Sequence, residues 1–217
     1  MRPFWHVGAL DALPLVSDQA AVAWSVTADG LLAASALAGT PATKADLADA
    51  VRGKDGGWRL LRRRLARALV AHLAGMRVVD VYLSRNEAGA PIIDSPGGWY
   101  LGLSARDGDC LIGVARRPIA VDREPLDHAT PLRDMLTPSE LSALDRLAEA
   151  DRPLDWLRRW TIKEAHAKLL GEPLRIRPED IETQIVSSEM ATATLEGVSH
   201  CWTQQTTTAI ETVALSA

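Results

Sequence analysis

An internal repeat constrains the fold of this chain more than any other feature of its sequence. The segment LLRRRLARALVAHLAG (60–75) aligns without gaps with WLRRWTIKEAHAKLLG (156–171), and six of the sixteen positions are identical. Both segments have the apolar spacing of an amphipathic helix, and both end in glycine, the usual residue after a helix C-terminus. The repeat therefore predicts two similar halves, each built around one long helix.

Helices and strands predicted from local patterns surround the two repeated segments. The predicted helices cover 41–52, with Thr40 or Thr43 as cap, 58–74, 138–149 and 153–170. The helix at 138–149 begins with Thr137, Pro138 and Glu140, which together form a capping-box pattern. The apolar or alternating runs typical of strands are AAVAWSVTA, RVVDVYLS, a meander of WYLGLS, DCLIGVA and PIAVD, and the tail TATLEG, SHCWTQQ and TAIETVALS. We therefore expect an α+β fold of two similar α/β subdomains in a pseudo-twofold arrangement, residues 1–104 and 105–217.

The charge distribution limits the ligands that the chain can bind. A net charge of −4 excludes a protein that binds polyanions over its whole surface. Residues 51–77 nevertheless contain Arg52, Lys54, Arg59, Arg62, Arg63, Arg64, Arg67 and Arg77 against the single acid Asp55. Some of these arginines form the solvated face of a helix, but their density favours a local anion pocket. The absence of interleaved aromatic residues argues against nucleic acid as the partner.

Cysteine usage and hydropathy predict the compartment. Cys110 and Cys201 have neither a metal-ligand spacing nor a C-x-x-C spacing, which favours buried, reduced thiols. No apolar run approaches the length of a membrane span, and the N-terminal segment lacks the pattern of a secretory signal. We therefore expect a cytoplasmic protein that does not enter a membrane.

Acidic residues in the second half suggest a site. Asp122 and Glu124 lie two residues apart in a predicted strand, and Glu164 precedes Lys168 by one helical turn. Each pair taken alone fits an exposed polar strand edge or a solvated ion pair. The repeat favours function, because Ala68 and His72 occupy the corresponding positions of the first half. Three carboxylates together would form a hard-oxygen site suited to Mg²⁺ and a phosphate substrate.

These residues resemble a known signature. AVDRE, followed after 35 residues by WTIKEAHAK, is similar to the two-part motif of the surfactin-synthetase-type 4′-phosphopantetheinyl transferases. That family consists of monomers with two similar α+β halves. It transfers the phosphopantetheine arm of coenzyme A to a serine of an acyl or peptidyl carrier protein, in fatty-acid, polyketide or nonribosomal peptide biosynthesis, and releases adenosine 3′,5′-bisphosphate.

The resemblance implies roles for particular residues. Asp122, Glu124 and Glu164 would hold Mg²⁺, with Mn²⁺ as the alternative ion, and Glu164 would also take the proton of the carrier serine. Lys168 would neutralise the leaving diphosphate. The implied coenzyme A contacts come from both halves, with the first half supplying a basic helix for the coenzyme A phosphate and the second the Mg²⁺ site and the catalytic helix. They are Arg59, Arg63, Ser104, Arg106, Lys163 and Lys168.

The chain departs from the family pattern on the coenzyme A side. Ala90 stands where the family often has lysine, Ala105 where it has histidine, and Ala120 where it has glycine. Arg106 or Arg85 are candidates to replace the missing donors. These departures motivate an alternative from another class of protein, a homologue with little or no catalytic activity that binds a carrier protein or a nucleotide without transferring the arm.

Overall fold

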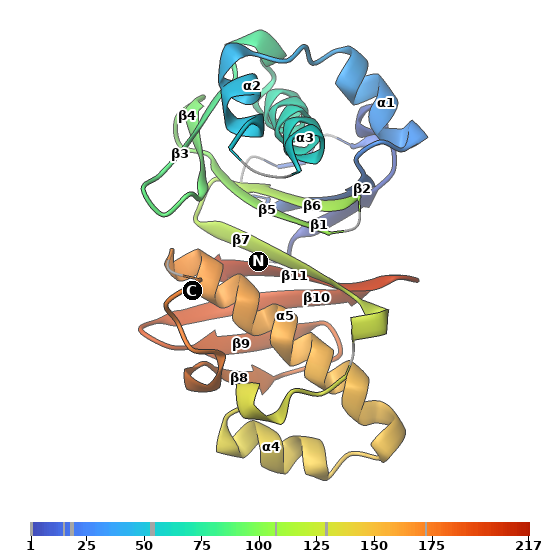
Figure 1. Cartoon of the computed structure of the whole chain (residues 1–217), viewed down its shortest axis with the longest axis vertical. Coiled ribbons are helices and arrows are strands. Elements are labelled where there is room, and N and C mark those ends of the chain that lie inside the picture. Colours follow the sequence, from blue (N-terminus) through green and yellow to red (C-terminus); the bar gives the residue numbers. More distant parts are fainter. Residues whose placement is uncertain are drawn as a thin grey trace. The chain divides into compact units, whose positions relative to one another are not determined.

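The computed structural model describes residues 2–14, 16–17, 20–52, 55–106, 108–128, 130–171 and 173–217. The chain forms two compact units, Met1–Arg117 and Pro118–Ala217 (Figure 1). The boundary predicted between residues 104 and 105 would lie inside strand β5 (Tyr100–Arg106). This strand forms a hairpin with β6 (Asp109–Ala115), and β6 also pairs with β2 (Val22–Thr27), so the whole hairpin stays in the first unit.

The first unit packs a long helix on a mixed sheet. The sheet order is β1-β2-β6-β5, and a separate ribbon contains β3 and β4. The remaining elements are β1 (Phe4–Val7), the 3₁₀ helix η1 (Leu10–Ala12), α1 (Leu31–Ala38), α2 (Lys44–Ala50), α3 (Gly56–Ala74), the 3₁₀ helix η2 (Val78–Asp80), β3 (Tyr82–Arg85) and β4 (Pro91–Ser95). Leu65 and Leu69 of α3 and Trp24 and Ile112 of the sheet are fully buried in one cluster. Burial of this apolar surface holds α3 on the sheet.

The second unit packs the other long helix, α5 (Arg152–Leu170), on an antiparallel sheet in the order β7-β11-β10-β9-β8. Its other main elements are β7 (Ile119–Pro125), α4 (Pro138–Asp145), the 3₁₀ helix η6 (Pro178–Asp180), β8 (Glu182–Ile185), β9 (Met190–Thr194), β10 (Val198–Gln205) and β11 (Ala209–Ser216). In Figure 1, α5 runs across this sheet. Ile162 and Ala165 of α5 pack on Ala193, Cys201 and Ala214 of the strands.

The expected α+β class is confirmed, and the long helices correspond closely. α3 and α5 each contain 19 residues, and each ends before a left-handed glycine, Gly75 (φ 62°) or Gly171 (φ 88°). A left-handed residue there ends the helix at no steric cost, because glycine has no Cβ. In both units the long helix is followed by a 3₁₀ helix and then by antiparallel strands.

Several predicted elements differ from the structure. The strand expected at 77–84 begins as the 3₁₀ helix η2 and is extended only from Tyr82. The helix expected at 138–149 ends at Asp145, although its Thr137–Glu140 capping box is present. The run PIAVD does not continue the meander, because β7 pairs with β11 of the distant tail. Hydropathy alone does not determine which distant strand becomes the neighbour.

A buried carboxylate ties α2 to α3 in the first unit. Asp46, the third residue of α2, completes a capping box with Thr43 and also binds Arg63 Nε (2.8 Å) and Arg67 Nη1 (2.8 Å). Both arginines are nearly inaccessible to solvent. Arg63 also donates to the carbonyl of Leu83. Two arginines of α3 are therefore structural, since each is paired and hydrogen-bonded as buried charges require.

Acid should weaken a second ion pair of this unit. Arg85 binds Asp49 through Nε (2.5 Å) and Nη2 (2.9 Å), and this hydrogen bonding lowers the pKa of Asp49 against the opposing effect of burial. A depressed carboxyl pKa contributes stability above the unfolded value of about 4, and that stability is lost as pH falls through the folded value. We expect Arg85→Met to lower the urea midpoint at pH 7 and to lower it much less at pH 3.

The control is Arg77→Met, which removes an exposed pair with Asp80. Exposed pairs contribute little, so this variant should unfold close to the wild type at both pH values. An equal deficit of Arg85→Met at pH 7 and pH 3 would contradict the assignment.

Two further expectations concern the cysteines and the membrane. Cys110 and Cys201 are both buried thiols, as expected. Burial raises the pKa of Cys201 to about 12, which keeps it protonated and unreactive at neutral pH. Among the described residues, no helix combines the length and the apolar character needed to cross a membrane.

Candidate active site

Strand β7 and helix α5 bring the predicted acidic residues to one face of the second unit. Asp122 is in register with Thr212 of β11, and the hydroxyl of Thr212 lies 2.8 Å from that of Thr161 on α5. Neighbouring residues of paired strands point to the same face, so Asp122 lies on the face that α5 covers. Glu124 follows two residues later on that face. The structure thus brings together side chains separated by some forty residues of chain.

Lys168 connects α5 to this face of β7. Its Nζ donates a hydrogen bond of 2.5 Å to Asp122 Oδ1 and forms an ion pair with it. Asp122 is 2% exposed, whereas Lys168 remains partly accessible. A buried carboxylate needs such a partner, because its unpaired charge would cost several kcal/mol (roughly 3–5). The i,i+4 spacing predicts a pair between Glu164 and Lys168, and the ion pair that the structure shows for Lys168 is with Asp122 of β7.

Glu164 is the residue whose ionisation this arrangement disturbs most clearly. Burial raises its pKa, and the neighbouring charges of Asp122 and Glu124 raise it further, while Lys168 acts in the opposite direction. Like charges that share a site make ionisation harder. Burial, with the added repulsion of Asp122 and Glu124, thus makes Glu164 a stronger proton acceptor than an ordinary carboxylate.

A divalent cation matches this donor set in chemistry. Three carboxylates supply the oxygen ligands that Mg²⁺ prefers, and a cation would relieve the repulsion that raises the pKa of Glu164. However, no group of three or more His, Cys, Asp or Glu side chains in the described part of the chain is gathered closely enough to hold a metal ion. Lys168 provides a positive charge next to Asp122.

The first unit lacks these charges at the corresponding positions. Ala68 and His72 of α3 take the places of Glu164 and Lys168. Strands β2 and β6 pair in this unit as β7 and β11 pair in the second, and Trp24 of β2, in register with Ile112, is fully buried. Glu164 and Lys168 are therefore features of the second unit and not requirements of the shared fold.

The structure places three of the predicted coenzyme A contacts in different settings. Arg63 is buried in the pairing with Asp46 described above. Arg59 is half-buried, and its Nε is enclosed without a hydrogen-bond partner among the described residues. Lys163 is 1% exposed and donates to the carbonyl oxygens of Pro178 (2.8 Å) and Ile181 (2.6 Å). Arg63 and Lys163 therefore serve the protein interior, and the sequence offered no direct sign of their burial.

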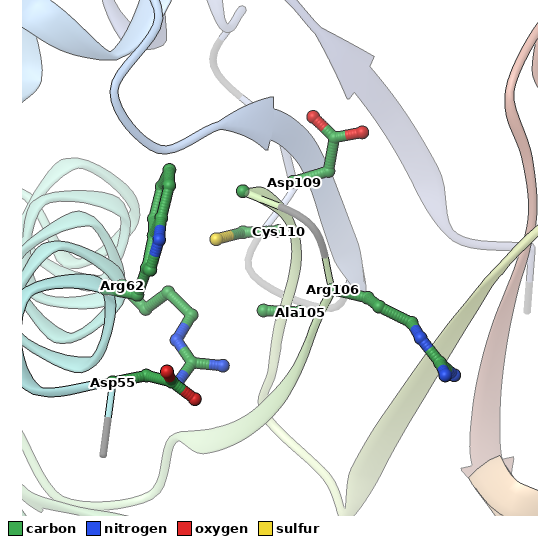
Figure 2. A pocket seen from close by; sticks show the side chains of 8 residues that line it. Asp55, Arg62, Ala105, Arg106, Asp109 and Cys110 are labelled. Carbon is green, nitrogen blue, oxygen red and sulfur yellow. The ribbon is translucent and has the colours of Figure 1, made fainter. Parts of the chain in front are cut away.

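A cavity of about 370 Å³ lies in the first unit between the start of α3 and the β5–β6 hairpin (Figure 2). It is lined by Asp55, Trp58, Arg62, Ala105, Arg106, Gly108, Asp109 and Cys110. Gly108 has a positive φ of 88°, and a Cβ there would lie 2.9 Å from the Trp58 ring, so only glycine lets the turn pack so closely. Figure 2 shows Arg62 and Asp55 together on one side and Arg106 pointing away from them.

The predicted Ser104 and Arg106 belong to strand β5 at this cavity. Ser104 is half-buried, Arg106 is exposed, and Ala105 between them lines the wall. Trp58 and Arg62 are not among the contacts that the resemblance implies. Their i,i+4 spacing at the start of α3 places them on one helix face and is the signal that would have found them. Arg85, the other candidate donor, is bound to Asp49.

The second unit is similar to a known protein family. Residues 118–216 match the family model of the 4′-phosphopantetheinyl transferase superfamily. The match covers the second unit, with Asp122, Glu124, Glu164 and Lys168 inside it. No curated protein matches the chain.

Proposed function

We propose, on the premise that residues 118–216 carry the pattern of the 4′-phosphopantetheinyl transferase superfamily, that this chain is such a transferase of the surfactin-synthetase type. It transfers the 4′-phosphopantetheine arm of coenzyme A to a serine of an acyl or peptidyl carrier protein. The observation that carries the proposal is the gathering of Asp122, Glu124, Glu164 and Lys168 on one face of the matched unit. The first unit, which has the same long helix, lacks this set.

The proposed reaction is a phosphoryl-type transfer in which the protein mainly positions groups and neutralises charge. The serine oxygen bonds to the phosphorus that carries the pantetheine arm, and the bond from that phosphorus to the bridging diphosphate oxygen breaks. Adenosine 3′,5′-bisphosphate leaves with the bonding electron pair. Glu164 accepts the serine proton, directly or through water, which suits its raised pKa.

Lys168 is proposed to neutralise the diphosphate as negative charge develops on the leaving group. Asp122, Glu124 and Glu164 are the residues that would hold Mg²⁺, or Mn²⁺ as the alternative ion. When bound, such an ion would supply further neutralisation of the diphosphate. The donor chemistry of the three carboxylates supports this assignment.

The cavity of the first unit supports a role for that unit in binding the nucleotide of coenzyme A. Arg62 and Trp58 offer a guanidinium and an aromatic ring at its wall. We expect Arg62→Ala to raise the KM for coenzyme A about tenfold with little change in kcat, because a charge-assisted hydrogen bond contributes roughly 1.5–3 kcal/mol. Steady-state kinetics measure this. Arg77→Ala, which removes an exposed arginine of the same unit, is the control.

The proposal is tested by incubating the protein with coenzyme A and Mg²⁺ and a panel of apo carrier proteins from fatty-acid, polyketide and peptide synthesis. Mass spectrometry should show a carrier whose mass increases by one phosphopantetheine arm. The alternative, a homologue that binds without transfer, is favoured by the alanines at positions 90 and 105. It predicts no modified carrier anywhere in the panel.

A further inference from the structure

Lys163 immediately precedes Glu164 on α5, yet its surroundings are those of a structural ion pair. Besides the carbonyls of Pro178 and Ile181, its Nζ lies 2.7 Å from Glu140 Oε2. Burial lowers the pKa of Lys163, and the bond to Glu140 opposes that shift. An ammonium group has three N–H donors, and three protein oxygens receive them. Lys163 therefore has no donor left for a ligand.

Glu140 connects this lysine to two further elements. It is the third residue of α4, where its Oε2 accepts the backbone N–H of Thr137 (2.8 Å) in the capping box. Its Oε1 accepts the backbone N–H of Thr183 in β8 (2.8 Å) and the hydroxyl of the same residue. A single buried carboxylate thus joins the start of α4, the middle of α5 and strand β8.

The first unit contains the same arrangement with a different pair of residues. Arg67, which aligns with Lys163, binds Asp46 in the capping box of α2 and donates to the carbonyls of Val78 (2.9 Å) and Val81 (3.2 Å) around η2. The carbonyls that Lys163 uses belong to Pro178 and Ile181 around η6, the corresponding 3₁₀ helix. A unit without the acidic cluster keeps this contact, so the contact belongs to the architecture and not to the binding of a ligand.

We propose that Lys163 is a positioning residue. Its bonds to Glu140 and to the carbonyls of Pro178 and Ile181 set the rotation and axial position of α5, and so the places of Glu164 and Lys168 opposite β7. Successive helix residues point about 100° apart, so fixing Lys163 toward η6 directs Glu164 toward a different face. The inference rests on the proposed transferase function. It replaces the expectation that Lys163 binds coenzyme A.

The two units suggest a reciprocal substitution as the test. Glu140 with Lys163 combines a longer acid with a shorter base, and Asp46 with Arg67 combines a shorter acid with a longer base. Made singly, Glu140→Asp or Lys163→Arg gives an acid and a base whose combined length does not fit the site. Made together, the two substitutions install the Asp–Arg pair of the first unit. Measurements are the melting temperature, kcat, the KM for coenzyme A, and amide hydrogen exchange in α5.

We expect Lys163→Met to lower the melting temperature by about 10 °C, because it leaves a buried carboxylate without its cation. Below that temperature it should lower kcat about tenfold or more, with the KM for coenzyme A within about twofold of the wild type. The single exchanges should lose less, and the double exchange should recover both stability and kcat. The double exchange also provides the test if Lys163→Met does not fold.

Arg67→Met is the matched control, because it breaks the corresponding ion pair with Asp46 in the first unit. It should lose similar stability and retain kcat. A tenfold rise in the KM for coenzyme A in a thermally stable Lys163 variant would show direct contact and overturn the inference. An unchanged kcat in folded Lys163→Met would overturn it as well.

Failure of the proposed function has a separate signature. If the wild type modifies no carrier protein, the transferase proposal fails. Hydrogen exchange alone then tests whether Lys163 positions α5. Amides of residues 162–168 should exchange faster in Lys163→Met and return to wild-type rates in the double exchange. Unchanged hydrogen exchange in Lys163→Met would overturn the positioning role of Lys163, whether or not the protein is a transferase.

Discussion

Replacing Glu164 by glutamine is expected to lower kcat/KM for transfer by about 10²- to 10⁴-fold, the usual contribution of a general base. Glutamine keeps the shape of the side chain but cannot accept the serine proton, and it removes one of the three carboxylates proposed to hold Mg²⁺. The measurement is the rate of carrier modification by mass spectrometry at saturating coenzyme A.

Stability provides the internal control for this substitution. The folded protein raises the pKa of Glu164, so folding disfavours its ionised form, and above the unfolded pKa the charge destabilises the fold. The neutral glutamine should therefore leave the melting temperature unchanged or raise it at pH 7. Glu149→Gln, an exposed glutamate of the same unit, should change neither rate nor stability. A fully active Glu164→Gln variant would remove Glu164 from the proposed role.

Replacing Lys168 by methionine is expected to lower kcat/KM by about 10²- to 10³-fold, as does the loss of one group that stabilises developing negative charge. It also removes the ion pair at the buried Asp122, so the melting temperature should fall. This combination of lost rate and lost stability distinguishes Lys168 from Glu164, whose substitution should cost rate alone. Kinetics and thermal unfolding of the two variants side by side test the distinction.

Lys44→Met is the matched control for Lys168, because Lys44 is an exposed lysine on α2. It should retain both rate and stability. Mg²⁺ should raise the melting temperature of Lys168→Met, since a bound cation would compensate the carboxylates around Asp122. If Lys168→Met transferred the arm at the wild-type rate, the neutralising role of Lys168 would be wrong.

The helix ends that carry a capping box or a left-handed glycine were the most predictable part of the fold, because the residues that end such a helix lie within a few positions of it. Thr137 with Glu140 marks the start of α4, and Gly75 and Gly171 follow the ends of α3 and α5, as predicted. Strand partners were less predictable. The run PIAVD pairs with a strand some ninety residues away, and such pairing depends on the packing of the whole sheet.

The repeat contained more information about the site than its motif alone. Arg63 aligns with Arg159 and Arg67 with Lys163, so both halves keep a basic residue at these two positions. The structure shows why, since each pair binds the buried carboxylate of a capping box. Glu164 corresponds to the uncharged Ala68 in the first half, and Lys168 corresponds to His72. The basic residues that both halves keep serve the fold, whereas Glu164 and Lys168, which the first half lacks, belong to the candidate site.

The sequence by itself determined the two long helices, their ends, the doubled architecture and the identity of the acidic residues, because these depend on residue type and short-range spacing. Only the tertiary structure decided which cations are available to a ligand. In the sequence, Lys163 and Lys168 are equally plausible ligand contacts. In the structure, the side chain of Lys163 is buried near η6, whereas that of Lys168, five residues further along the helix, reaches Asp122. Burial distinguishes the two lysines, because a charged group removed from water must form its hydrogen bonds with the surrounding protein.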